Sequence, residues 1–339
     1  MSHGLTSELI RDATALAALE TQWWRLWTRV PSATPFQSPA WLLPWWRAFA
    51  PGELSVVAVR SAGRLVALAC CYIETGARGR RILPMGISVT DYHDVLIDPE
   101  FADPAAAVLA SSMTQADWDE WEFGEIAPGA QAFRLPTPSG CVETVEPGSA
   151  CPVLALPDRP EALRETYPAR KRRSLRLARN RAARRGRLII TSADAQTAVE
   201  MFEELVRLHC ARWSDCGETG VLADPPIQQF HRDAVPRLLS AGLIRLCVLR
   251  IADQMSAAYY GFLHRSRAYG YLTGFDPAYK YESPSVILLD HVIAQALKDG
   301  AREFHFLRGR EPYKYGWGAV DRWNKRRVFR RMRIHACAS

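Results

Sequence analysis

The second half of the chain alternates helical and strand-like segments in an order that few folds accommodate. A strand at 187–192 precedes helices at 195–213 and 226–241, and three hairpin-linked strands follow. The series ends with a helix at 284–299 stopped by Gly300, a strand at 303–307, a helical turn at 311–317 and a last strand at 326–334. This order predicts an α/β fold of the mixed α+β kind, with helices on both faces of a mixed sheet.

The first half shows a looser version of the same order. A helix at 11–29 precedes strands at 54–60 and 64–74, and a helix at 103–114 leads into a strand at 118–126. A chain of 339 residues is also too long for one ordinary domain. We therefore expect an internal duplication with two tandem domains. They are 1–150 and 151–339, and the second includes a helix at 160–185.

Composition excludes several classes of protein. No run of about 18 uncharged apolar residues is present, and the N-terminus lacks the pattern of a signal peptide. Eight cysteines occur without a CxxC motif or zinc-ligand spacing, which predicts free thiols in a reducing cytoplasm and no metal site. The positions are Cys70, Cys71, Cys141, Cys151, Cys210, Cys216, Cys247 and Cys337.

Positive charge is concentrated in one stretch. The net charge is +7, and the segment 170–187 holds ten Lys or Arg residues among eighteen and no acid. Within it, Arg172, Arg176 and Arg179 recur at helical spacing and form one basic ridge. This ridge suits the phosphates of CoA, a tRNA, an acyl-carrier protein or anionic lipid, while a solvated helix face is the plainer alternative.

The segment from Tyr269 to Gly300 carries the clearest binding signal. A strand runs into a loop and then into a helix that begins with Ser283 as its cap and Pro284 in its first turn. Unpaired N–H groups and the positive dipole end favour an anion at such a helix start. An ordinary Ser-Pro helix start gives the same sequence, so spacing alone leaves both interpretations open.

Several ordered segments resemble one family. They include KRRSLRLARNRAARRG, FEELVRLHCARW, AAYYGFLH, YGYLTGFDPAY, ESPSVILL and EFHFLRGREPYKYGWG. Together they resemble the CelD-like branch of the GNAT acyltransferase superfamily, which is associated with cellulose biosynthesis and related to the Fem peptidyltransferases. The resemblance covers nearly the whole chain and is strongest from about residue 165 to residue 318.

The resemblance implies an acyl-CoA site between two splayed parallel strands, here 267–275 and 303–307. The pyrophosphate would lie on the helix that starts at 284. The implied cofactor-binding residues are Ser283, Ser285, Val286, Tyr271, Thr273 and Gly274. The usual phosphate signature, Arg/Gln-x-x-Gly-x-Gly/Ala, is absent, and Tyr281-Glu282-Ser283-Pro284-Ser285 stands in its place. An aminoacyl-tRNA or a carrier-protein donor therefore stays open beside acetyl-CoA or a longer acyl-CoA.

Acyl transfer to an amine needs a base or a site that selects the neutral amine, and an acid for the leaving thiolate. Tyr313 occupies the place of the family's tyrosine acid. His305, Glu311 and Asp276 are candidate bases, and each has a structural alternative as a sheet or turn residue. Residues that we expect to contact the acceptor are His209, Arg212, Tyr259 and Lys314.

These features predict an N-acyltransferase that uses an acyl-CoA or related thioester, with no metal. The family resemblance alone implies the kind of amine acceptor, which would be an amino sugar or an envelope or polysaccharide precursor. The N-terminal domain would be structural or would form the acceptor side. Two alternatives remain: an aminoacyl-tRNA-dependent transferase of the Fem type, and a non-catalytic scaffold of a polysaccharide-synthesis system.

Overall fold

The computed structural model describes residues 4–332, which form two compact units. The first unit contains the chain up to Ser149 and the segment from Trp323 onward, and the second unit runs from Ala150 to Arg322. The chain passes from the first unit to the second between Ser149 and Ala150, close to the boundary expected near residue 150. Residues 323–332, which the sequence assigned to the second domain, return to the first unit. Among the described residues, no helix is both long enough and apolar enough to span a bilayer.

The first unit is a mixed sheet with helices against it. The strands follow the order β1-β2-β3-β4-β6-β13, and β5 pairs with β3. Their bounds are Leu5–Ile10, Glu53–Ser61, Arg64–Gly76, Gly79–Pro84, Glu120–Ile126, Val320–Arg331 and, for β5, Leu96–Ile97. The helices are α1 (Ala13–Ala18), α2 (Glu20–Arg29), α3 (Pro39–Phe49) and α4 (Ala102–Met113).

The second unit repeats this plan. Its strands follow the order β7-β12-β11-β10-β9-β8. Their bounds are Cys141–Ala155, Glu303–His305, Arg267–Phe275, Gln254–His264, Ile244–Ile251 and Leu188–Ser192, and β7 begins in the first unit because the boundary falls at Ala150. The helices are α5 (Leu163–Thr166), α6 (Ala169–Arg185), α7 (Ala198–Asp215), α8 (Pro225–Ser240), α9 (Pro284–Lys298) and α10 (Pro312–Tyr315).

Each unit contains a parallel strand pair connected through a helix. In the first unit β4 pairs in parallel with β6, and α4 lies between them in the sequence. In the second unit β11 pairs in parallel with β12, and α9 lies between them. The predicted mixed α/β fold with tandem related domains is therefore confirmed.

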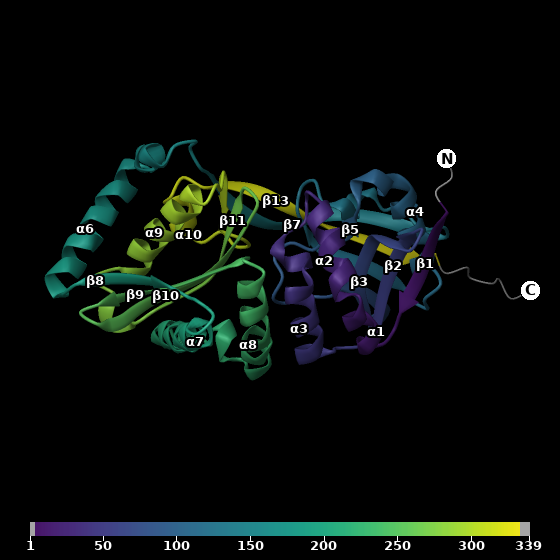
Figure 1. The fold of residues 1–339 in the computed structure, drawn as a ribbon, viewed down its shortest axis with the longest axis horizontal. Coiled ribbons are helices and arrows are strands. Elements are labelled where there is room, and N and C mark those ends of the chain that lie inside the picture. The colour runs from purple at the N-terminus through teal and green to yellow at the C-terminus, as the bar shows by residue number, and fades with distance from the viewer. Residues whose placement is uncertain (1–3, 333–339) are drawn as a thin grey trace, which may run out of the picture. The chain divides into compact units, whose positions relative to one another are not determined.

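Helices cover both faces of the second unit's sheet (Figure 1). On one face, α6 and α9 bury Leu175, Ala178 and Ile293 in a core shared with alternate residues of β9 and β10. On the other face, α7 and α8 bring aromatic rings onto Tyr260, with Phe202 at 6.5 Å and His231 at 5.4 Å between ring centroids. The long helix predicted at 160–185 starts only at Ala169, because Pro168 keeps Tyr167 extended.

The cysteines of the described chain are free thiols. Cys337 and the end of the predicted last strand, residues 333–334, lie outside the described residues.

Candidate active site

The pairing between β11 and β12 ends early. Only three register pairs join them, from Arg267 opposite Glu303 to Tyr269 opposite His305. Strand β11 continues to Phe275, so its C-terminal part lies beside no β12 residue. The register with β10 also shifts at this point, where Tyr260 lies opposite Leu272 and Gly261 opposite Gly270. A bulge of this kind re-aims the side chain at its centre, here Tyr271.

A pocket of about 220 Å³ lies at this end of the strands. We call it the donor pocket. It is mainly apolar and draws its walls from β11, β12, α9 and the segment around α10, with single contributions from α6, α7 and β10. The lining residues are Lys171, Arg212, Tyr259, Gly270, Tyr271, Thr273, Phe275, Ser285, Val286, Leu289, Phe304, Phe306, Tyr313 and Trp317.

The N-terminus of α9 faces this pocket through Ser285 and Val286. The hydroxyl of Ser285 is buried and has no hydrogen-bond partner among the described residues. Helix starts present unpaired N–H groups and positive partial charge, so an anionic group is stabilised there. The orphaned hydroxyl adds a further donor to the same place.

Two cationic side chains border the donor pocket. The ammonium group of Lys171 lies 4.2 Å from the centre of the Trp317 ring, and burial lowers the pKa of this lysine. The guanidinium of Arg212 lies 5.7 Å from the Phe275 ring centre. No carboxylate or imidazole lines the pocket within residues 4–332, so its field is positive.

Tyr313 also lines the pocket. Desolvation and the nearby Glu311 carboxylate raise the pKa of Tyr313 to about 12. Its hydroxyl therefore stays protonated at neutral pH, which is the state that a proton donor needs.

Comparisons with known proteins agree with this geometry. Residues 169–315 match the model of the acetyltransferase (GNAT) domain. The second unit is a GNAT-type N-acyltransferase domain. No curated protein sequence matches the chain.

Solved structures resemble the whole chain in fold. FemX is similar with a TM-score of 0.65 and 11% identity over 95% of this chain and 96% of that one. A conserved protein of unknown function from Bacteroides thetaiotaomicron has a TM-score of 0.60 and 11% identity, covering 95% and 100%. L-PGS from Bacillus licheniformis has a TM-score of 0.55 and 10% identity, covering 92% and 91%. At these identities the likeness concerns the fold.

The GNAT domain brings seven of the predicted site residues together around the donor pocket. These are Arg212, Tyr259, Tyr271, Thr273, Ser285, Val286 and Tyr313. Tyr259 is held in place because its hydroxyl donates a hydrogen bond to the carbonyl oxygen of Tyr269 at 3.2 Å.

Three other predicted site residues do not line the donor pocket and instead make contacts that support the fold. Ser283 adopts a left-handed conformation with φ of 54°, and its hydroxyl donates to the Lys280 carbonyl rather than capping α9. Gly274 allows close packing of β11 on α7, since a Cβ there would come within 2.5 Å of the His209 backbone nitrogen. His209 is buried and accepts a hydrogen bond from the Trp213 indole at 3.0 Å.

The candidate bases lie away from the pocket lining. His305 alternates with Phe304 and Phe306 along the chain, and those two phenylalanines line the donor pocket. The imidazole instead contacts the Glu303 carboxylate at 3.1 Å and stacks near Tyr269, with ring centroids 5.0 Å apart. His305 is therefore outside the donor pocket, and the structure favours its alternative as a sheet residue over the candidate base.

The two acidic candidates have structural surroundings of their own. Asp276 caps a short turn by accepting a hydrogen bond from the Ala278 backbone at 2.9 Å. Glu311 is half-exposed and forms an ion pair with Lys314 at 2.9 Å.

Lys314, which we expected to contact the acceptor, does not line the donor pocket and binds backbone carbonyls instead. Its ammonium group is buried and donates to the carbonyl oxygens of Leu307, Arg308 and Gly309 at 3.2, 2.6 and 3.1 Å. Its three N–H donors are thus shared among these carbonyls and the Glu311 carboxylate, all within the segment that follows β12. Lys314 therefore fixes this loop, which leads into α10 and Tyr313.

Sequence reasoning missed several pocket residues. Lys171 belongs to the basic stretch 170–187, and its spacing did not distinguish it as a pocket residue from the other basic residues there. Trp317, Phe304 and Phe306 have the pattern of core residues, and Gly270 carries no signal at all. A Cβ at Gly270 would lie 3.1 Å from the Phe304 ring, so the pocket depends on a small residue there.

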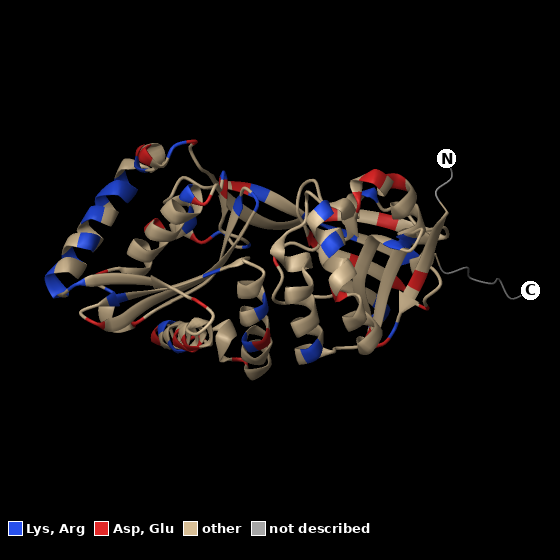
Figure 2. Cartoon of the chain, in the orientation of Figure 1, with Lys and Arg blue, Asp and Glu red and all other residues tan. Residues whose placement is uncertain are grey.

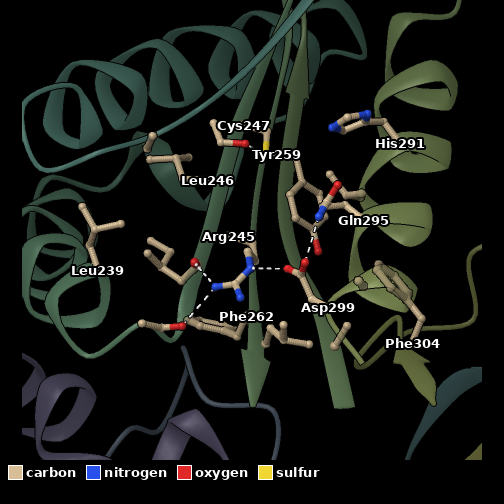
Figure 3. A pocket seen from close by; sticks show the side chains of 18 residues that line it. Leu239, Arg245, Leu246, Cys247, Tyr259, Phe262, His291, Gln295, Asp299 and Phe304 are labelled. Atoms are coloured by element: carbon tan, nitrogen blue, oxygen red, sulfur yellow. Dashed lines mark hydrogen bonds and ion pairs between the residues drawn. The ribbon is translucent and has the colours of Figure 1, made fainter. Parts of the chain in front are cut away.

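A second pocket of about 320 Å³ lies toward the C-terminal half of α9 (Figure 3). It shares Tyr259 and Phe304 with the donor pocket, so these two rings separate the two spaces. At its centre Arg245 pairs with Asp299 at 3.3 Å, and Gln295 donates to the same carboxylate at 2.8 Å. These polar groups satisfy one another, which leaves the donor pocket as the better candidate for chemistry.

Proposed function

We propose that the GNAT domain transfers an acyl group from an acyl-CoA to an amine. The observation that carries this proposal is the donor pocket, where an orphaned Ser285 hydroxyl at the start of α9 meets an apolar channel between β11 and β12. Ser285 and the α9 N-terminus would hold the phosphates, with Lys171 and Arg212 nearby as counter-charges. The rings of Phe304, Phe306 and Trp317 would flank the apolar arm.

CoA supplies an activated thioester, and the chain's own groups handle the proton. The amine nitrogen forms a bond to the carbonyl carbon as the carbon–sulfur bond breaks. Tyr313 donates its hydroxyl proton to the departing sulfur, and the attacking nitrogen loses a proton to water. A tyrosine with a pKa of about 12 is regenerated by the solvent at neutral pH.

The apolar walls of the pocket explain how such a site works without a base among its lining residues. Removal from water disfavours the charged form of an amine, so the neutral form is favoured in the pocket. A neutral amine already has the free electron pair that attack requires. We infer that the acceptor enters as the free amine.

For the acceptor class, we propose an amino sugar or another amine-bearing precursor of envelope or polysaccharide material. The sequence resemblance to the CelD-like branch supports this. A competition panel of amino sugars, diamines and amino acids, read by release of free CoA thiol, identifies the acceptor.

Calorimetric titration with acetyl-CoA and longer acyl-CoAs tests the donor assignment. Ser285→Asp places a negative charge at the start of α9 and should abolish saturable binding. Ser266→Asp adds the same charge at an exposed turn and should leave it unchanged. If the wild-type chain binds no CoA ester, the donor assignment is wrong.

A second candidate is an aminoacyl-tRNA donor. The observation that favours it is α6, where basic residues cover the helix without an acid among them (Figure 2). Binding of aminoacyl-tRNA that weakens steeply between about 50 and 200 mM salt, with no CoA binding, would select this candidate.

A further inference from the structure

A third pocket of about 300 Å³ lies between α6 and α9 and is separate from the donor pocket. We call it the arginine pocket. Four arginines line it together with a tyrosine, an asparagine, a leucine and an aspartate. These residues are Arg164, Tyr167, Arg172, Leu175, Arg176, Arg179, Asn180 and Asp290.

Positive charge in the arginine pocket exceeds negative charge. Asp290 is buried and pairs with Arg179 at 2.8 Å, which balances one positive charge. Arg164, Arg172 and Arg176 have no ion-pair partner anywhere in the described chain. Three like charges around one hollow repel each other, and an anion placed between them removes that cost.

Two buried donors in the pocket make no regular hydrogen bond within the described chain. Tyr167 is only 2% exposed, and its hydroxyl makes no hydrogen bond of regular geometry among residues 4–332, although the Asp290 carboxylate lies near enough to act on it. The Nε of Arg179 is likewise buried without such a bond, although its Nη2 holds Asp290. Burying a donor without an acceptor costs about 1–3 kcal/mol, so such groups usually mark a ligand or an ordered water.

The surroundings fix both the position and the protonation of Tyr167. Its ring packs edge-on against Trp317, with centroids 5.1 Å apart, and Pro168 follows it directly. Burial and the nearby Asp290 carboxylate raise the pKa of the phenol, so the hydroxyl keeps its proton and can donate. Trp317 also lines the donor pocket, so one aromatic layer separates the two pockets. The hydroxyl is thereby held among the arginines by packing.

We propose that the arginine pocket binds a phosphate ester group. A guanidinium group can donate two parallel hydrogen bonds to two oxygens of one phosphate. The neutral hydroxyl beside the arginines can donate a hydrogen bond to a further phosphate oxygen. A phosphate on the nucleotide end of a donor and a phosphate of another ligand share this chemistry. The site is independent of the Ser285 position and does not depend on the proposed reaction.

The test is calorimetric titration of the full chain with pyrophosphate at constant ionic strength. Arg172→Gln with Arg176→Gln should weaken binding at least about 10-fold. Arg170→Gln with Arg173→Gln removes the same charge from α6 outside the pocket and should leave affinity within about 2-fold. Tyr167→Phe, which keeps the ring packing, should weaken binding about 10-fold, as expected for a hydrogen bond to a charged group.

Three outcomes would overturn the proposal. They are the absence of saturable binding, equal effects of the two double variants, and an affinity that stays unchanged both in Tyr167→Phe and in the Arg172/Arg176 double variant. Ser285→Asp serves as a further control, because binding that this variant abolishes belongs to the donor pocket. A comparison of CoA with dephospho-CoA then identifies the source. A preference for CoA that disappears in the Arg172/Arg176 variant assigns the site to its 3′-phosphate, and equal affinity assigns it to another phosphate ligand.

Discussion

Lys314 offers the sharpest quantitative test of the site's architecture. Its side chain is 3% exposed and donates to three backbone carbonyls of the loop after β12. Lys314→Met keeps the length of the side chain and removes the ammonium group. The three carbonyl oxygens then lose their donor, and Leu307, held at φ of 59°, loses the contact that fixes its conformation.

The expected cost is about 3–5 kcal/mol. Each unsatisfied buried acceptor costs about 1–3 kcal/mol, and water entering the opened loop recovers part of the sum. The half-exposed Glu311 loses an ion pair worth only about 0–1 kcal/mol. For a unit of this size the total corresponds to a fall in Tm of about 6–20 °C.

Urea unfolding followed by tryptophan fluorescence measures the change. Lys298→Met on the exposed last turn of α9 is the matched control, and it should cost less than about 1 kcal/mol. Acyl transfer should also fall in Lys314→Met, because the loop positions Tyr313. Equal stability of the two variants would refute the account of Lys314 as the donor that fixes this loop.

The other predictions concern chemistry, acid stability and packing. Tyr313→Phe should lower kcat about 100-fold with little change in KM. In the wild type, the alkaline loss of activity that arises from this group should appear only near its pKa of about 12. Steady-state assays in which the variant changes KM alone would argue against Tyr313 as a proton donor. Burial lowers the pKa of His231 to about 3, so the folded state binds fewer protons than the unfolded state below about pH 6.5 and stability falls on acidification. His231→Asn should therefore reduce the slope of unfolding free energy against pH between about pH 4 and 6 by about 1.4 kcal/mol per unit, and an unchanged slope in urea titrations would contradict this. Gly274→Ala should destabilise the chain by about 1–3 kcal/mol, because its Cβ would meet the His209 backbone; thermal unfolding no different from wild type would show that α7 moves freely.

Periodic segments were predictable, and weakly patterned ones were not. Helices α7, α8 and α9 follow apolar spacing with clear stops, so their prediction needed only local signals. Strand β1, with mostly exposed residues, and the first part of β7, which has the composition of a loop, gave no such pattern. Both form because neighbouring strands pair with them, which is information that lies elsewhere in the chain.

The site shows the same division between local and distant causes. The start of α9 was predictable from its strand–loop–helix pattern, whereas Tyr313 was proposed only because the sequence resembles the GNAT family. His305 could not be placed, since alternation along β12 fixes which residues share a face but not which face meets the pocket. That choice depends on α9, whose apolar side covers Phe304 and Phe306. The role of Lys314 depended on backbone carbonyls that no side-chain pattern reveals.

The return of the chain to the first unit has a consequence for biosynthesis. Strand β13 lies beside β6, and Phe329 packs on Trp121 with ring centroids 5.1 Å apart. The ribosome makes residues 150–322 before this strand exists, which takes about 10–35 s at the usual rates. During that interval β6 is an open edge that invites pairing with another nascent chain. A truncated chain ending at Ser149 would lack β13 and would keep that edge of β6 open permanently.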